Sequence, residues 1–227
     1  AAALWLFIKE KLAQNTTIIA VGLLMILDLV LVDKKYVDAE GFVSKREVEV
    51  PFQETPADVQ ILQDKSHYRV FEIDGNLSSA RASFFHKSIG GYSAVKPRRM
   101  QQLFDYQIAK NNIEILNMLN VKYIIQTDST GNSVPVQNPE ANGNAWFIKD
   151  LLLVNKPDDV MKALGKLDTK HDAVFNVHDY GKKYKNARLK EDFDDSGTIQ
   201  LDVYKPNYLK YTSNNSGKGL AVFSEIY

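Results

Sequence analysis

The sequence predicts an α+β protein that begins with a membrane-type helix. Three observations support this fold class: residues 16–32 form an apolar run, residues 33–185 mix helical and strand patterns, and residues 186–227 hold strand-like runs between turns. We therefore expect three parts in chain order. They are membrane helix segments over 1–32, an extracytoplasmic mixed α/β region over 33–185, and an antiparallel β-sandwich-like portion over 186–227.

The apolar run is typical of a helix that spans a bilayer. The sequence TTIIAVGLLMILDLVLV at 16–32 contains Asp28 as its only charge, and a second apolar stretch at 1–8 precedes the charged turn at Lys9 and Lys11. The positive-inside rule places this turn in the cytoplasm and residues 33–227 outside the cytoplasm, with 16–32 in contact with lipid. The alternative is a buried hairpin of a soluble protein.

Composition limits the possible partners and chemistry. Lys and Arg together number 28, as do Asp and Glu, so the chain lacks the basic field of a protein whose main partner is nucleic acid. The absence of cysteine excludes disulfides and thiolate chemistry. The four histidines, at 67, 86, 171 and 178, lack metal-ligand spacing. We predict no metal site and no cofactor.

The mixed region shows clear start and stop signals. Thr55-Pro56-Ala57-Asp58 is a capping box that opens a helix, and YRVFEI at 68–73 alternates as a strand does. The remaining predictions are an extended arm or strand at 42–50, helices at 56–63, 97–110, 113–119 and 157–164, strands at 122–125, 145–148 and 151–154, and a loop at 127–143.

The C-terminal portion has the spacing of short antiparallel strands. Four strand-like runs, at 186–193, 198–204, 208–213 and 219–227, are separated by Asp, Asn, Ser and Gly turns. A basic run (Lys182, Lys183, Lys185, Arg188, Lys190) precedes acidic residues at 191–195. The basic run could bind lipid headgroups and the acidic residues could bind calcium. Alternatively, both runs lie on the faces and turn of one hairpin. The final run ends within a strand pattern, so we expect a piece of a longer protein.

The stretch FFHKSIGGYSAVKPRR at 84–99 is the candidate binding loop. Adjacent glycines indicate that the backbone approaches another group closely. A proline followed by arginines indicates a helix N-terminus with cationic side chains beside it. Such an arrangement can bind an anion. The candidate ligand-binding residues are His86, Lys87, Gly90, Gly91, Tyr92, Lys96, Arg98 and Arg99. The alternative is a rigid structural turn before a solvated helix start.

Aromatic residues offer a second possible contribution to ligand binding. Tyr92, Trp146, Tyr204, Tyr208 and Tyr211 have flat faces that could stack on sugar rings, or they could pack the core and edges of a β domain. No Ser-His-Asp set and no pair of carboxylates can be assigned from the sequence, so no catalytic residue is predicted.

Several stretches together resemble the YfhO family of large bacterial multi-spanning membrane proteins. The most specific are FHKSIGGY at 85–92 and LNMLNVKY at 116–123, and NGNAW at 142–146 and YKPN at 204–207 add to them. The resemblance covers nearly the whole chain. It implies an extracytoplasmic domain that follows a bundle of membrane helices similar to glycosyltransferases that use polyprenyl-phosphate sugars. It also implies that the catalytic carboxylates lie outside this chain.

The apolar run predicts a membrane anchor, and the resemblance implies that the anchored domain belongs to a glycosyltransferase that acts on cell-envelope glycans. We expect the domain to bind a polyprenyl-phosphate sugar or an envelope glycan, or to be structural, rather than to catalyse transfer by itself. The alternative is a structural or protein-interaction domain of a membrane protein.

Overall fold

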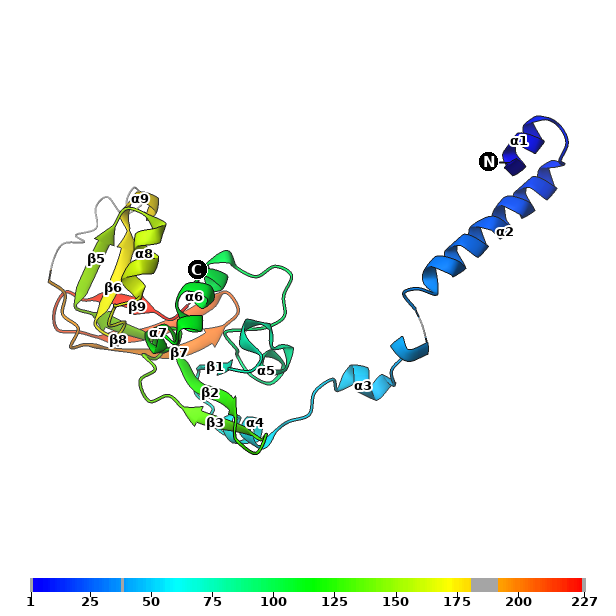
Figure 1. Ribbon diagram of the computed structural model, residues 1–227. Coiled ribbons are helices and arrows are strands. Elements are labelled where there is room, and N and C mark those ends of the chain that lie inside the picture. The colour runs from blue at the N-terminus through cyan, green and yellow to red at the C-terminus, as the bar shows by residue number, and fades with distance from the viewer. Residues whose placement is uncertain (1, 38, 181–191, 226–227) are drawn as a thin grey trace. The chain divides into compact units, whose positions relative to one another are not determined.

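The computed structural model describes residues 2–37, 39–180 and 192–225 (Figure 1). The chain forms two compact units, Ala1–Gln53 and Glu54–Tyr227. Helices and strands both occur in quantity, which confirms the predicted α+β class.

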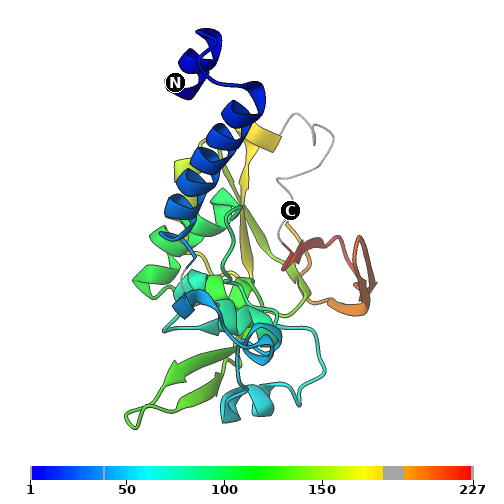
Figure 2. The same cartoon turned by 90° about the vertical axis from the view of Figure 1, so that its right-hand side faces the viewer.

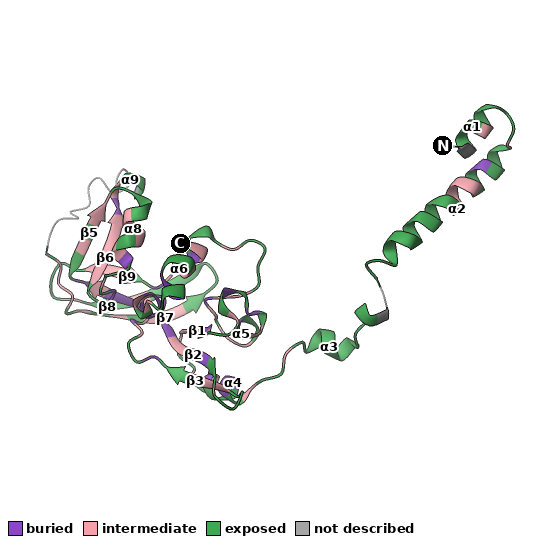
Figure 3. Cartoon of the chain, viewed as in Figure 1, coloured by how far each residue is buried: buried purple, intermediate pink, exposed green. Residues whose placement is uncertain are grey.

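The N-terminal unit is built around one long apolar helix. Helix α1 (Ala2–Ile8) precedes α2 (Gln14–Asp33), whose 20 residues rise about 1.5 Å each and so extend about 30 Å, the thickness of a bilayer core. Apolar side chains cover α2 on all sides, and nearly all of them are exposed (Figure 3). By length and composition α2 is able to cross a membrane, as the sequence predicted. Thr17, which is buried, bonds back to the Ala13 carbonyl.

The predicted extended arm at 42–50 is wrong, because this segment contains a short helix. The 3-10 turn η1 (Ala39–Gly41) is followed by α3 (Lys45–Glu49). The Ser44 hydroxyl accepts a hydrogen bond from the Glu47 amide at 3.3 Å, and the Ser44 amide donates to the Glu47 carboxylate at 2.8 Å. This capping box satisfies two amides at the helix start, so it outweighs the loose alternation of apolar residues.

The C-terminal unit is organised on a three-stranded sheet. Strand β1 (Arg69–Glu72) pairs in parallel with β2 (Val121–Thr127), and β2 pairs antiparallel with β3 (Ser133–Gln137). Figures 1 and 2 show β2 and β3 as one long hairpin. The prediction of a loop over 127–143 is therefore wrong in part, because β3 lies within this range. Pro135 lacks an amide donor, and β3 tolerates it as an edge strand.

The connection from β1 to β2 is helical. It contains η2 (Asn76–Ser78), α5 (Ala80–Phe85), α6 (Arg98–Tyr106), η3 (Ile108–Lys110) and α7 (Ile113–Met118). A parallel pair requires a long crossover of this kind, because the chain must return to the start of the sheet. The predicted helix at 97–110 is thus α6 plus η3, and the helix at 113–119 is α7.

The core lies on both faces of this sheet. Phe71 of β1 joins a cluster with Met100, Ile115 and Leu164 on the side of α6 and α7. The neighbouring Val70 joins Ile61 of α4 (Pro56–Ile61) on the other side. Successive strand residues point to opposite faces of the sheet, so each of the two clusters packs against one face of β1.

The rest of the unit adds a parallel pair and a hairpin. Strands β5 (Asp150–Val154) and β6 (Asp172–Asn176) pair in parallel around α8 (Pro157–Leu164), and α9 (Val177–Tyr180) follows. Strands β7 (Thr198–Lys205) and β8 (Tyr208–Asn214) form an antiparallel hairpin. Strand β9 (Leu220–Phe223) pairs antiparallel with β4 (Ala145–Ile148). These pairings confirm the predicted strands at 198–204, 208–213 and 219–227 up to residue 223. Most of the predicted strand at 186–193 and all of the basic run lie outside the described residues.

Candidate ligand-binding cleft

The first of the candidate ligand-binding residues, His86, points into the protein. Its Nε2 lies 2.8 Å from Oδ1 of Asp58, and both side chains are almost fully removed from water. Asp58 Oδ2 accepts from the Thr55 amide at 2.7 Å and from Arg81. Arg81 also donates to Glu72 at 3.0 Å. His86 therefore belongs to a buried polar network that connects α4, α5 and β1.

The two glycines of the loop pack against their own chain. A side-chain carbon at Gly90 would lie 2.7 Å from the Asn76 carbonyl oxygen. The Gly91 amide donates to the Leu77 carbonyl at 3.0 Å, and Lys96 Nζ donates to the same oxygen at 3.1 Å. The close approach that the glycine pair predicted is thus an approach to residues 76–77.

The remaining predicted residues lie in different surroundings. Tyr92 is exposed, and Arg98 lines a separate cleft of about 750 Å³ with residues of α6 and α8. Arg99 is exposed at the start of α6. Lys87 points towards His67 and Tyr204. The structure therefore distributes the eight predicted residues over several sites, and Lys87 is the one that contacts residues lining the cleft described next, although it does not line the cleft itself.

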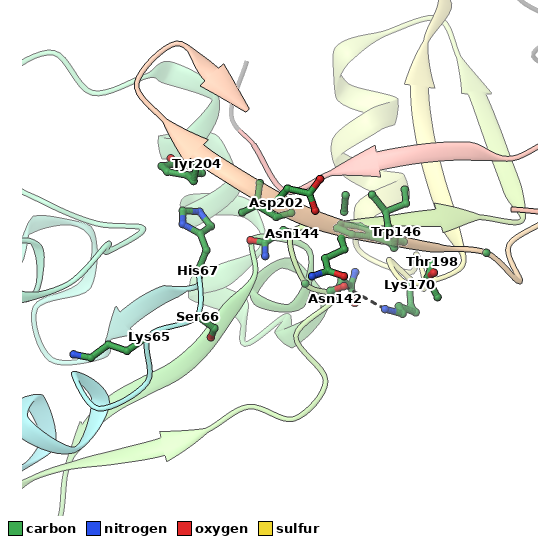
Figure 4. Close-up of a pocket in the computed structure, with 16 residues that line it drawn as sticks. Lys65, Ser66, His67, Asn142, Asn144, Trp146, Lys170, Thr198, Asp202 and Tyr204 are labelled. Atoms are coloured by element: carbon green, nitrogen blue, oxygen red, sulfur yellow. Dashed lines mark hydrogen bonds between the residues drawn. The ribbon is translucent and has the colours of Figure 1, made fainter. Parts of the chain in front are cut away.

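A polar cleft of about 680 Å³ lies beside strand β7 (Figure 4). Four segments build it: the residues before β1, the segment that leads into β4, Lys170, and β7 itself. Tyr204 and His67 lie at one end, Asn142, Asn144 and Asp202 near the centre, and Trp146 and Thr198 at the other end. The segments come from distant parts of the sequence, which is why no single motif marked the cleft.

Hydrogen bonds hold the amide side chains of the cleft wall in place. Asn142 Nδ2 and Trp146 Nε1 each donate to the Thr169 carbonyl at 3.0 Å. Asn144 Oδ1 accepts from Asn120 Nδ2 at 3.0 Å. Lys170 Nζ donates to the Asn142 carbonyl at 3.2 Å. Side chains fixed in this way lose little conformational entropy when a ligand binds.

Three side chains form one rim of the cleft. The rings of His67 and Tyr204 pack together with centroids 3.8 Å apart and planes tilted by 31°, and Lys87 Nζ lies 4.5 Å from the Tyr204 centroid. Lys87 Nζ also donates to His67 Nδ1 at 2.7 Å, so His67 carries its proton on Nε2. Tyr204 remains 44 % exposed. We call His67, Lys87 and Tyr204 the rim triad.

The rim triad keeps His67 neutral. Burial, followed by the positive charges of Lys87 and Arg69, lowers the pKa of His67 from 6.5 to about 4. On its other side, His67 Nε2 lies 3.9 Å from Glu225 Oε1, and Arg69 binds this carboxylate at 3.2 Å. At neutral pH the triad therefore presents one cation and two flat rings.

The aromatic residues named from the sequence have separate roles. Trp146 is buried and Tyr211 packs edge-on against Phe223 with centroids 4.9 Å apart, so these two rings are structural. Tyr204 is at the cleft. Tyr92 and Tyr208 are exposed and do not line it. His67, Asn142, Asn144, Lys170 and Asp202 were missed, although NGNAW at 142–146 was noted for its resemblance.

The cleft offers groups that suit a ligand with many hydroxyls. Amides and hydroxyls both donate and accept, Lys170 donates, and the Asp202 carboxylate accepts from Thr212 at 2.6 Å. Within the ranges that the structure describes, no group of three or more His, Asp and Glu side chains is placed to hold a metal ion.

Comparison of the chain with family models, with curated proteins and with solved structures gives no match. The similarity to the YfhO family therefore stays a prediction, and the cleft and the apolar helix are the structural features that bear on function.

Proposed function

We propose that the chain is the membrane-tethered, extracytoplasmic part of a bacterial envelope glycosyltransferase and that its cleft binds a sugar-containing ligand. The observation that supports this function best is the rim triad. Tyr204 is packed on His67 and held next to Lys87, yet it keeps exposed ring surface at the mouth of a cleft lined with fixed amides. Aromatic rings with polar groups around them are the usual components of a small-ligand site.

The positive charge of Lys87 favours a ligand that carries a phosphate group. Lys87 is an ammonium donor beside the exposed ring, and ammonium groups bind phosphate oxygens through charge-assisted hydrogen bonds. A polyprenyl-phosphate sugar carries both a phosphate and a sugar, and an envelope glycan supplies the sugar alone. The cleft positions the ligand, and the carboxylates for glycosyl transfer belong to parts of the parent protein outside this chain.

The location proposed for the cleft follows from the apolar helix. With α2 in the bacterial inner membrane and the Lys9/Lys11 turn in the cytoplasm, residues 33–227 lie outside the cytoplasm, where lipid-linked sugars are consumed. This location is supported by the charge of the turn and by the family resemblance.

Calorimetry on the full chain in lipid nanodiscs tests the proposal. A short-chain polyprenyl-phosphate sugar and the free sugar are titrated into the wild type and into Tyr204→Ala, Lys87→Met and Tyr208→Ala variants. We expect Tyr204→Ala to weaken both ligands at least tenfold and Lys87→Met to weaken mainly the phosphate-bearing one. Tyr208→Ala, which removes an exposed ring from the same hairpin outside the cleft, should bind as the wild type does.

Equal binding by the wild type and Tyr204→Ala, or no binding by the wild type, would contradict a sugar site in this cleft.

A second candidate is a structural or protein-interaction domain. The buried network of Asp58, Arg81 and His86 favours it, because in this network His86 stabilises the fold and is not available to a ligand. This function predicts that variants of the cleft alter neither ligand binding nor transfer by the parent protein, whereas variants of the network lower the melting temperature.

A further inference from the structure

The segment between β1 and α6 differs in charge from the rest of the chain. Acidic residues make up 28 of the 227 residues, yet none lies between Asp74 and Asp105. The same segment contains five Lys and Arg residues. Arg81 is used inside the buried network and Lys87 in the rim triad, while the other three, Lys96, Arg98 and Arg99, follow the glycine pair within a few residues.

Two side chains protrude just before these cations. Val95 is 88 % exposed and Tyr92 is 82 % exposed, which puts them, with Tyr36, among the three most exposed large apolar side chains in the part of the chain that the structure describes. Their backbone is held from behind, because the Gly91 amide and Lys96 Nζ both bond the Leu77 carbonyl. The loop therefore presents an aromatic and an aliphatic side chain from a fixed base. We call residues 91–99 the basic loop.

Such a combination suits a bilayer surface with anionic lipids. Tyrosine prefers the level of the headgroups, where its ring is in an apolar setting and its hydroxyl is in water. Lysine and arginine close to this level attract anionic lipid headgroups. Arg98 and Arg99 are both exposed to solvent at the start of α6.

The chain also keeps a bilayer within reach. Helix α2 ends at Asp33, and the C-terminal unit begins at Glu54. Even fully extended, the intervening segment spans no more than about 70 Å. An anchored α2 thus holds the C-terminal unit at a high local concentration near lipid, where a weak contact is sufficient.

We propose that the basic loop is a docking surface for anionic lipid, with Tyr92 and Val95 entering the headgroup region and Arg98 contacting lipid phosphates. The proposal rests on the membrane anchor of the proposed function but not on sugar binding in the cleft. A docked loop would limit the rotation of the C-terminal unit on its tether and keep the nearby Lys87 close to the membrane surface.

A fluorescence experiment tests this docking. Because the chain has no cysteine, Ala94→Cys places a single label between the two protruding side chains, and Ser129→Cys places a matched label at the exposed turn of β2 and β3. The labelled full chains are incorporated into nanodiscs of phosphatidylcholine alone or with 30 % phosphatidylglycerol. Lipids with a nitroxide near the headgroup then quench any label at the membrane surface.

We expect the label at 94 to be quenched at least twice as strongly as the label at 129 in anionic discs, and less strongly in neutral discs. Adding Arg98→Glu should reduce this quenching, whereas Arg98→Lys should retain it. Equal quenching at 94 and 129, or equal quenching in neutral and anionic discs, would overturn the docking proposal alone. Failure of the chain to enter the discs would overturn the anchor and the docking together, and a protein partner for the loop would leave the label unquenched.

Discussion

His86 Nε2 lies 2.8 Å from Asp58 Oδ1, and the two side chains retain 2 % and 0 % of their exposure to solvent. This contact joins the first turn of α4 to the end of α5 across 28 residues of sequence. Burial alone would raise the pKa of Asp58, but hydrogen bonds from Thr55 and His86 and the charge of Arg81 outweigh it and lower the pKa. Asp58 is therefore an ionised, fully bonded carboxylate inside the fold.

Removal of either partner should destabilise the C-terminal unit. Loss of one partner leaves the buried polar group of the other without a hydrogen bond, and this typically costs about 1–3 kcal/mol. We expect Asp58→Ala and His86→Ala each to lower the free energy of unfolding by this order, measured by urea denaturation of the full chain. Lys162→Ala, which removes an exposed partner of Asp159 at 3.7 Å, should cost less than about 1 kcal/mol. Equal losses in all three variants would contradict the role given to the network.

Gly90 should not tolerate a side chain. An added methyl group would lie 2.7 Å from the Asn76 carbonyl oxygen, which belongs to the backbone and cannot rotate away. Gly90→Ala should therefore lower the free energy of unfolding by about 1–3 kcal/mol, as overpacking does. Ala94→Val adds volume to the exposed part of the same loop and should change it by less than about 0.5 kcal/mol. A neutral Gly90→Ala in the same urea titration would show that this turn is loosely packed.

Local signals predicted much of the fold and little of the site. The capping box at Thr55 is present as expected, and the strands and helices up to Leu164 mostly lie where their periodicity placed them. The same Asp58 also binds His86, which no local pattern could show, because pairing across 28 residues depends on the tertiary fold.

The errors have physical causes as well. At residues 42–50 two local rules disagreed, and the capping box of Ser44 and Glu47 outweighed the alternation. Strand β3 was missed because Pro135 and the nearby turn residues hide a pairing that only β2 makes favourable. The cleft could not be predicted, since its lining comes from segments as far apart as Lys65 and Tyr204.

The stability of the C-terminal unit should fall as the pH falls from about 6.5 to about 4. The pKa of His67 is lowered from 6.5 to about 4 in the folded state, so the unfolded chain binds the proton more readily within this window. The full effect is about 3 kcal/mol, since each pKa unit corresponds to about 1.4 kcal/mol. The lowered pKa of Asp58 acts in a different window, because its stabilisation is lost only as the pH falls below 3.8.

Lys87→Met isolates the contribution of the rim cation to this effect. Removal of the charge should raise the pKa of His67 towards 6.5, while burial still holds it below that value. The titration of the His67 ring signal by NMR measures this pKa directly, with His67→Gln for assignment. A His67 pKa near 6.5 in both the wild type and Lys87→Met would show that the rim triad does not form.

Charge at the centre of α2 should weaken membrane anchoring. Leu24→Arg places a cation near the middle of the apolar helix, where it costs about 2.5–3.5 kcal/mol of insertion free energy. The fraction of chain that stays with membranes after alkaline extraction should fall. Gln14→Arg, at the end of the same helix, should leave this fraction unchanged. If Leu24→Arg stays bound as the wild type does, α2 is not the anchor.

The most direct test of the central proposal observes the cleft while ligand is added. The chain has two tryptophans, of which Trp146 lines the cleft and Trp5 lies in α1, so selective labelling of tryptophan gives one reporter and one internal control. We predict that a polyprenyl-phosphate sugar shifts the indole N–H signal of Trp146, leaves that of Trp5 in place, and loses this effect in Tyr204→Ala. Titration to saturation with no shift at Trp146, or with the same shift in Tyr204→Ala, would contradict a sugar-binding cleft.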